Sequence, residues 1–101
     1  MDKIHNQVGP HLDELAKLDG AVDDFACEMK TKLHRKALEG ARGWDDPTFY
    51  TKLRIDLNAH ADRLIRDEDP QEIDIANLAM MLWFQRERRS SDSATGETDG
   101  G

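Results

Sequence analysis

The sequence predicts an all-α protein, an antiparallel bundle of about four helices followed by a disordered tail. Apolar residues recur every three or four positions along most of the first 89 residues, which is the spacing of one helix face. No segment shows the alternation of apolar and polar residues that is typical of a half-buried β-strand. Glycine and proline interrupt the helical pattern and separate the predicted helices.

The first half of the chain predicts two helices. Pro10 suits the first position of a helix whose apolar face carries Leu12, Leu15 and Leu18, and Gly20 is expected to end or kink that helix. A second amphipathic helix follows and is expected to end near Gly40. Its apolar face contains Val22, Phe25, Met29, Leu33 and Ala37.

Two further helices are predicted after the loop over residues 40–47. Asp46 and Pro47 form a cap and first turn for a helix that runs to about Ile65. Asp69 and Pro70 offer the same pair of signals for the fourth helix, and Glu72 completes a motif that resembles a capping box. The connection between these two helices is short, so we expect them to be antiparallel neighbours.

The length predicts a single helical domain over residues 1–89. Residues 90–101 are rich in serine, glycine and acidic side chains and contain no large apolar residue. Such a segment buries too little apolar surface to offset the entropy of ordering, so we expect a disordered tail.

The composition limits which partners the protein is expected to bind and in which compartment it is expected to occur. The net charge of −7 argues against nucleic acid as a partner, because an acidic surface repels the phosphate backbone. No apolar run approaches the roughly 20 residues that span a bilayer, and the amino terminus lacks the apolar region of a signal peptide. The single cysteine favours a reducing compartment. We therefore expect a cytoplasmic protein with no membrane partner.

The fourth predicted helix is apolar around most of its circumference but carries Asp74 and Asn77 near its middle. An unpaired buried polar group costs roughly 1–3 kcal/mol, so a ligand or a polar partner is expected for both side chains. On the preceding helix, Asp56 and His60 share a face. Asp56, Asp74 and Asn77 together offer the oxygen ligands that Mg²⁺ prefers, and such an ion would bridge the phosphates of a nucleotide.

The residues predicted to contact the nucleotide come from several segments. His60, Arg63 and Arg86 are candidates for the phosphates, and Trp44 is the candidate for the base. These side chains also have a structural interpretation that involves no ligand. Asp74 and Asn77 would form a buried hydrogen-bond network that fixes the helix register, Trp44 would anchor its loop, and Arg86 would complement a helix dipole.

The apolar surface of the fourth helix also predicts self-association. Its large side chains cover more of the circumference than one packing face requires. We therefore expect a homo-oligomer whose interface contains Met80, Met81, Trp83 and Phe84.

Three segments of the chain together resemble a known family. These are Gly43-Trp44-Asp45-Asp46-Pro47, the helix from Leu53 to Leu64, and the run from Asp69-Pro70 through Asp74-Ile75-Ala76-Asn77-Leu78-Ala79-Met80-Met81-Leu82. They resemble small phage-type proteins related to the MazG-like all-α nucleoside triphosphate pyrophosphohydrolases, including the dATP/dGTP diphosphohydrolase-like members. The resemblance covers roughly residues 25–83.

The resemblance implies an oligomeric, Mg²⁺-dependent enzyme that releases pyrophosphate from nucleoside triphosphates. The family takes its metal ligands from a Glu-Glu-x-x-Glu motif on one helix and a Glu-x-x-Asp motif on the next. Asp74 matches the final aspartate, whereas Gln71 stands where the preceding glutamate belongs. In the first motif Asp56 is the one carboxylate that remains.

The loss of these carboxylates favours binding over catalysis on the same scaffold. The first hypothesis is therefore a nucleotide-binding accessory protein of phage type, with hydrolysis of (d)NTPs ranked below binding. The alternative is a non-enzymatic counter-defence protein that inhibits a host protein or sequesters a nucleotide signal in the host cytoplasm. Its motivation is the acidic surface, which suits electropositive partners.

Overall fold

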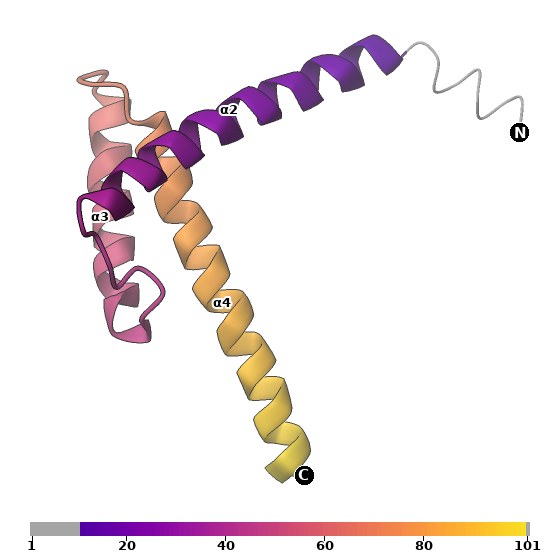
Figure 1. Cartoon of the computed structure of the whole chain (residues 1–101), viewed down its shortest axis with the longest axis vertical. Helices are drawn as coiled ribbons and strands as arrows, with labels where there is room; N and C mark the ends of the chain where they lie inside the picture. The colour runs from indigo at the N-terminus through magenta and orange to yellow at the C-terminus, as the bar shows by residue number, and fades with distance from the viewer. Residues whose placement is uncertain (1–10, 101) are drawn as a thin grey trace, which may run out of the picture.

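The computed structural model describes the backbone of residues 11–100 and the side chains of residues 11–90, and within these limits the chain is all-helical. Three long helices form the fold, where the sequence predicts about four. Figure 1 shows α3 and α4 as an antiparallel hairpin, with α2 crossing it near the connection between them. None of the described helices is both long enough and apolar enough to cross a membrane.

The two helices predicted before residue 40 are one continuous helix, α2 (Leu12–Leu38). Gly20 lies inside it, so the predicted break at this residue is wrong. A glycine in a helix interior costs about 1 kcal/mol relative to alanine, which is too little to end a helix whose periodicity continues on both sides. The predicted end near Gly40 is confirmed, because Gly40 adopts a φ of 98° and the Ala41 N–H donates to the Lys36 carbonyl at 3.0 Å. Pro10 lies outside the described residues.

Asp46 and Pro47 cap and begin a short 3₁₀ turn, and the α-helix after it begins three residues later than predicted. Oδ1 of Asp46 accepts hydrogen bonds from the backbone N–H and the hydroxyl of Thr48, both at 3.0 Å. A short 3₁₀ turn, η2 (Pro47–Phe49), leads into α3 (Tyr50–Ile65). The α3 helix ends as predicted, and Asp67 in the following turn takes a φ of 55°.

The last helix, α4 (Glu72–Gly100), begins later than predicted. Asp69 and Pro70 lie before it, and the first helical hydrogen bond runs from the Ile75 N–H to the Gln71 carbonyl at 2.9 Å. The reason is the burial of Gln71, whose side chain is 5% exposed and bonds His60 on α3. This contact fixes the first turn of α4 after the Asp-Pro pair.

The carboxyl-terminal part of α4 enters the segment 90–101 for which the sequence predicts disorder. Helix α4 extends to Gly100, while the side chains of residues 91–101 lie outside the described residues. The disordered tail and the single domain over residues 1–89 remain predictions.

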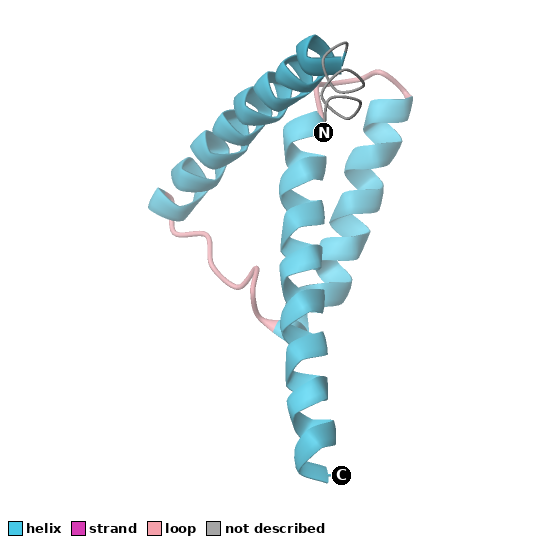
Figure 2. Cartoon of the chain, turned by 90° about the vertical axis from the view of Figure 1, so that its right-hand side faces the viewer, coloured by secondary structure: helices cyan, strands magenta, loops and turns pink. Residues whose placement is uncertain are grey.

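The packing of the described helices is open. Figure 2 shows α3 and α4 side by side and α2 inclined against them. Leu53 is the one buried apolar residue within the described part of the chain, at 7% exposure. The amino-terminal half of α2 projects beyond the hairpin, as Figure 1 shows. The fold therefore leaves a cleft beside α2 and a long apolar helix face without a partner.

Candidate functional site

The candidate site is a cleft of about 640 Å³ between α2, the loop that follows it, and the α3–α4 hairpin. Its apolar wall comes from all three segments and consists of Leu33, Ala37, Ala41, Leu78, Met80 and Met81. Its polar lining consists of Lys32, His34, Lys36, Arg42, Asp56, His60, Asp74 and Asn77, and Trp44 completes the cleft. Helix α4 contacts both α2 and α3.

Asp74 is paired with a lysine that the helical pattern of the sequence does not single out. Lys32 Nζ lies 2.5 Å from Asp74 Oδ1, and this ion pair joins α2 to α4. Oδ2 of the same carboxylate faces His60 Nδ1 at 3.9 Å. Both Asp74 oxygens are thus directed at nitrogen atoms, and less than a third of either side chain in the Lys32 pair is exposed. In this structure Asp74 therefore lies in a polar network with Lys32 and His60.

His60 is bonded to Gln71, at the position where the resemblance implies a glutamate. Its Nδ1 atom lies in a short contact with the Gln71 side-chain oxygen, which joins α3 to the start of α4. A neutral amide oxygen accepts a hydrogen bond from the ring without adding a charge to the site. At position 71 the chain therefore carries an interhelical hydrogen bond where the resemblance implies a metal ligand.

Asn77 is buried at 5% exposure, and one of the two polar atoms of its side chain has no hydrogen-bond partner among the described residues. Its Nδ2 atom donates to the Met29 carbonyl of α2 at 3.5 Å, while its Oδ1 atom is buried without a hydrogen-bond partner among the described residues. A buried oxygen without a partner costs about 1–3 kcal/mol, so this atom is a weak point of the packing between α2 and α4. Asn77 is therefore placed as a packing contact between α2 and α4.

Asp56 lines the same cleft but has its own partner. Lys52 Nζ lies 2.8 Å from Asp56 Oδ2, one helical turn away on α3. A Mg²⁺ ion shared by Asp56, Asp74 and Asn77 would have to displace two ammonium groups and reach the enclosed oxygen of Asn77. Within the described residues, no three His, Cys, Asp or Glu side chains gather as metal ligands. The side chains present do not fit the predicted Mg²⁺ site.

Trp44 anchors its loop on α4 and also lines the cleft, while its contact with a base remains a prediction. Its ring packs edge-on against Phe84 of α4, with centroids 4.9 Å apart and an interplanar angle of 61°. Its carbonyl accepts a hydrogen bond from Gln85 Nε2 at 2.6 Å, and the same amide donates to the Asp46 carbonyl at 3.1 Å. The loop is thereby fixed on α4, and Trp44 lines the cleft from that position.

Two of the predicted phosphate-binding residues lie outside the cleft. Arg63 is exposed near the end of α3 and does not line it. Arg86 donates from Nη2 to the Tyr50 hydroxyl at 3.4 Å, on a separate groove of the hairpin. This hydrogen bond lowers the pKa of the Tyr50 hydroxyl, because it favours the phenolate. The structure therefore does not bring Arg63 or Arg86 together with Asp56 and Asp74.

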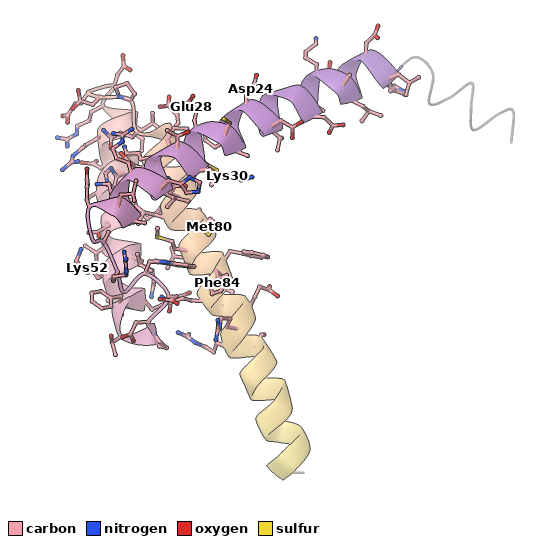
Figure 3. The ribbon with its side chains drawn as sticks, in the orientation of Figure 1. Asp24, Glu28, Lys30, Lys52, Met80 and Phe84 are labelled. Atoms are coloured by element: carbon pink, nitrogen blue, oxygen red, sulfur yellow. The ribbon has the colours of Figure 1, made fainter. Side chains whose placement is uncertain are left out.

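The four residues predicted for an oligomer interface have different surroundings. Met80 and Met81 line the cleft, and Phe84 packs against Trp44. Figure 3 shows Met80 and Phe84 along the part of α4 that faces the rest of the chain. Trp83 is 60% exposed and is free to contact another molecule. The interface itself remains a prediction.

The cations of the cleft were not predicted from the sequence. Lys32, Lys36 and Arg42 come from the end of α2 and the loop after it. The signal for the two lysines was the basic run over residues 30–36, which is typical of the solvated side of an amphipathic helix. This side of α2 lines the cleft because α2 crosses α4. The periodicity of one helix does not specify such a crossing. Three cations therefore line a cleft in a protein whose net charge is −7.

Comparison of the chain with protein-family models, with curated proteins and with solved structures found no match. The resemblance to the MazG-like family therefore rests on the three segments of the sequence alone.

Proposed function

We propose that the chain is a nucleotide-binding helical protein whose ligand occupies the cleft between α2 and the hairpin. The observation that carries the proposal is the combination of an apolar wall, the aromatic ring of Trp44 and three cations in one concave site. Ligand sites of this size are mostly apolar with a few placed polar groups. A nucleotide suits that combination because it has a flat apolar base and a polyanionic end.

The phosphates are assigned to the end of the cleft formed by Lys36 and Arg42. Lys32 is already paired with Asp74, and Arg42 Nη1 donates to the carbonyls of Ala37 and Ala41 at 3.0 and 2.7 Å. Lys36 has no carboxylate within ion-pair distance among the described residues. It is therefore the cation with the most to gain from an anionic ligand, and the base is assigned to Trp44.

The proposed activity is binding, with hydrolysis ranked below it. Asp56 and Asp74 are each neutralised by a lysine, and Gln71 is bonded to His60. A pyrophosphohydrolase needs carboxylates that are free to hold metal ions and stabilise the charge of the transition state. A protein that binds without cleaving would sequester its nucleotide, which is also one form of the counter-defence role.

Titration calorimetry with dATP and dGTP tests the proposal through a matched pair of charge reversals. Lys36→Glu changes a cation of the cleft, whereas Lys30→Glu makes the same change on the exposed surface of the same helix. We expect Lys36→Glu to raise the dissociation constant by about tenfold or more and Lys30→Glu to change it by less than about twofold.

Two results would contradict nucleotide binding. One is the absence of binding heat with any of the common nucleotides at millimolar concentration. The other is an equal loss of affinity in both variants, because that would indicate a general charge effect. Titration of Mg²⁺ alone belongs to the same experiment, and we expect no binding heat because the carboxylates are paired with lysines.

A further inference from the structure

The amino-terminal half of α2 carries an apolar stripe that nothing in the described chain covers. Leu15, Leu18, Val22 and Phe25 are spaced by three and four residues and lie on one side of the helix. All four are exposed, Val22 to 64% and Leu18 to 52%. The spacing is that of a helix seam that packs against another helical surface.

This half of α2 is also strongly acidic. Between residues 12 and 28 the one basic residue is Lys17, whereas the acidic residues are Asp13, Glu14, Asp19, Asp23, Asp24 and Glu28. Figure 3 shows Asp24 and Glu28 on the side of α2 that is turned away from α4. Pairing of two such stripes with each other would bring like charges together, so the surface requires a cationic partner.

A second surface without a partner lies on the hairpin. A groove of about 720 Å³ runs between α3 and α4 and shares no lining residue with the nucleotide cleft. Its apolar lining includes Ile55, Leu57, Ala61 and Leu82, and its charged lining is Arg54 and Arg86. No described acidic residue lines it. The groove is thus apolar and cationic, whereas the stripe is apolar and acidic.

The two surfaces also match in length. From Leu15 to Phe25 the stripe extends roughly 15 Å at 1.5 Å per residue, and the α3 side of the groove, from Tyr50 to Ala61, extends roughly 16 Å. Within one chain the two surfaces do not meet, because the contacts of Lys32 with Asp74 and of Met29 with Asn77 place α2 on the cleft side of the hairpin.

We propose that the amino-terminal half of α2 of one copy of this chain docks into the α3–α4 groove of a second copy. Burial of the stripe supplies the driving force, at about 25 cal/mol for each Å² of apolar surface. Arg54 and Arg86 set the orientation through the acidic residues that flank the stripe. Two copies that exchange their helices in this way form a closed dimer with two identical contacts.

Complementation between variants tests this arrangement. Val22→Asp disables the stripe and Ile55→Asp disables the groove, while Ile65→Asp is the matched control because Ile65 is 82% exposed and lines neither surface. We expect light scattering to give a dimer for the wild type and for Ile65→Asp. Each of the other variants is expected to be a monomer at the same micromolar concentration, because a charge in the contact raises the dissociation constant by about a hundredfold.

The decisive measurement is native mass spectrometry of the Val22→Asp and Ile55→Asp variants after mixing. The Val22→Asp variant keeps its groove and the Ile55→Asp variant keeps its stripe. We therefore expect the mixture to form a heterodimer with one copy of each variant. A mixture that stays monomeric overturns the proposal, since an intact stripe and an intact groove would then not be enough for docking. An Ile55→Asp variant that is a dimer by itself overturns it too, since that result indicates pairing of stripe with stripe. A wild type that is monomeric overturns it as well. Leu18→Asp and Arg54→Glu replace either variant whose circular dichroism departs from that of the wild type.

Discussion

Lys32 of α2 and Asp74 of α4 form an ion pair of 2.5 Å at the point where the two helices cross. The pair explains how an aspartate is accommodated on a helix with an otherwise apolar circumference. The Asp74 carboxylate also faces His60 Nδ1 at 3.9 Å, so both of its oxygens are directed at nitrogen atoms of other helices.

A double-mutant cycle with Lys32→Met and Asp74→Asn measures the strength of this pair. We expect a coupling free energy of about 1 kcal/mol or more, because both side chains are largely removed from water. Lys52 and Asp56 provide the control, since they form an exposed pair one turn apart on α3, for which about 0.3–0.5 kcal/mol is expected. Denaturant unfolding gives both values. A coupling for Lys32 and Asp74 no larger than the control would show that the pair does not hold α2.

Replacement of Asn77 tests whether its buried oxygen has a role. Asn77→Leu removes a long hydrogen bond to the Met29 carbonyl and an oxygen that has no partner in the described chain. We expect the free energy of unfolding to stay within about 1 kcal/mol of the wild type, because an apolar side chain of similar size removes the cost of the unsatisfied oxygen.

Asn77→Ala is the companion variant, and it leaves a cavity at the same position. We expect it to lower the free energy of unfolding by about 1–3 kcal/mol, measured by the same denaturant unfolding. If Asn77→Leu were as destabilising as Asn77→Ala, the Asn77 oxygen would have a partner that is essential for the fold.

The cap at Asp46 predicts a pH dependence of stability. The hydrogen bonds from the Thr48 N–H and hydroxyl lower the pKa of Asp46 from its ordinary value of 3.8. The folded state therefore favours the carboxylate, and this contribution is fully present above pH 3.8 and lost as the pH falls through the folded pKa. Asp46→Asn keeps an oxygen acceptor but does not titrate.

Thermal melts of the wild type and Asp46→Asn between about pH 6 and about pH 2 check this prediction. We expect the advantage of the wild type in Tm to shrink as the solution is acidified. A difference in Tm that is constant across this range would mean that the Asp46 carboxylate contributes no more than a neutral cap.

Helical periodicity and capping chemistry predicted much of the secondary structure. The cap at Asp46, the helix end at Ile65 and the helix end near Gly40 are confirmed because each depends on neighbouring residues, whereas α3 itself begins three residues after Pro47. Gly20 misled the prediction because a single glycine weakens a helix without ending it. Asp69 and Pro70 misled it because the burial of Gln71 moved the first turn of α4.

The sequence by itself determined the helical class and the positions of Asp56, His60, Asp74 and Asn77 on faces that line one cleft. The partners of these side chains were decided by the tertiary structure. Lys32 reaches Asp74, and Lys36 and Arg42 line the cleft, because the carboxyl-terminal half of α2 crosses α4. The crossing depends on contacts between residues more than 40 positions apart, such as Asn77 with Met29, and periodicity along one helix contains no information about them.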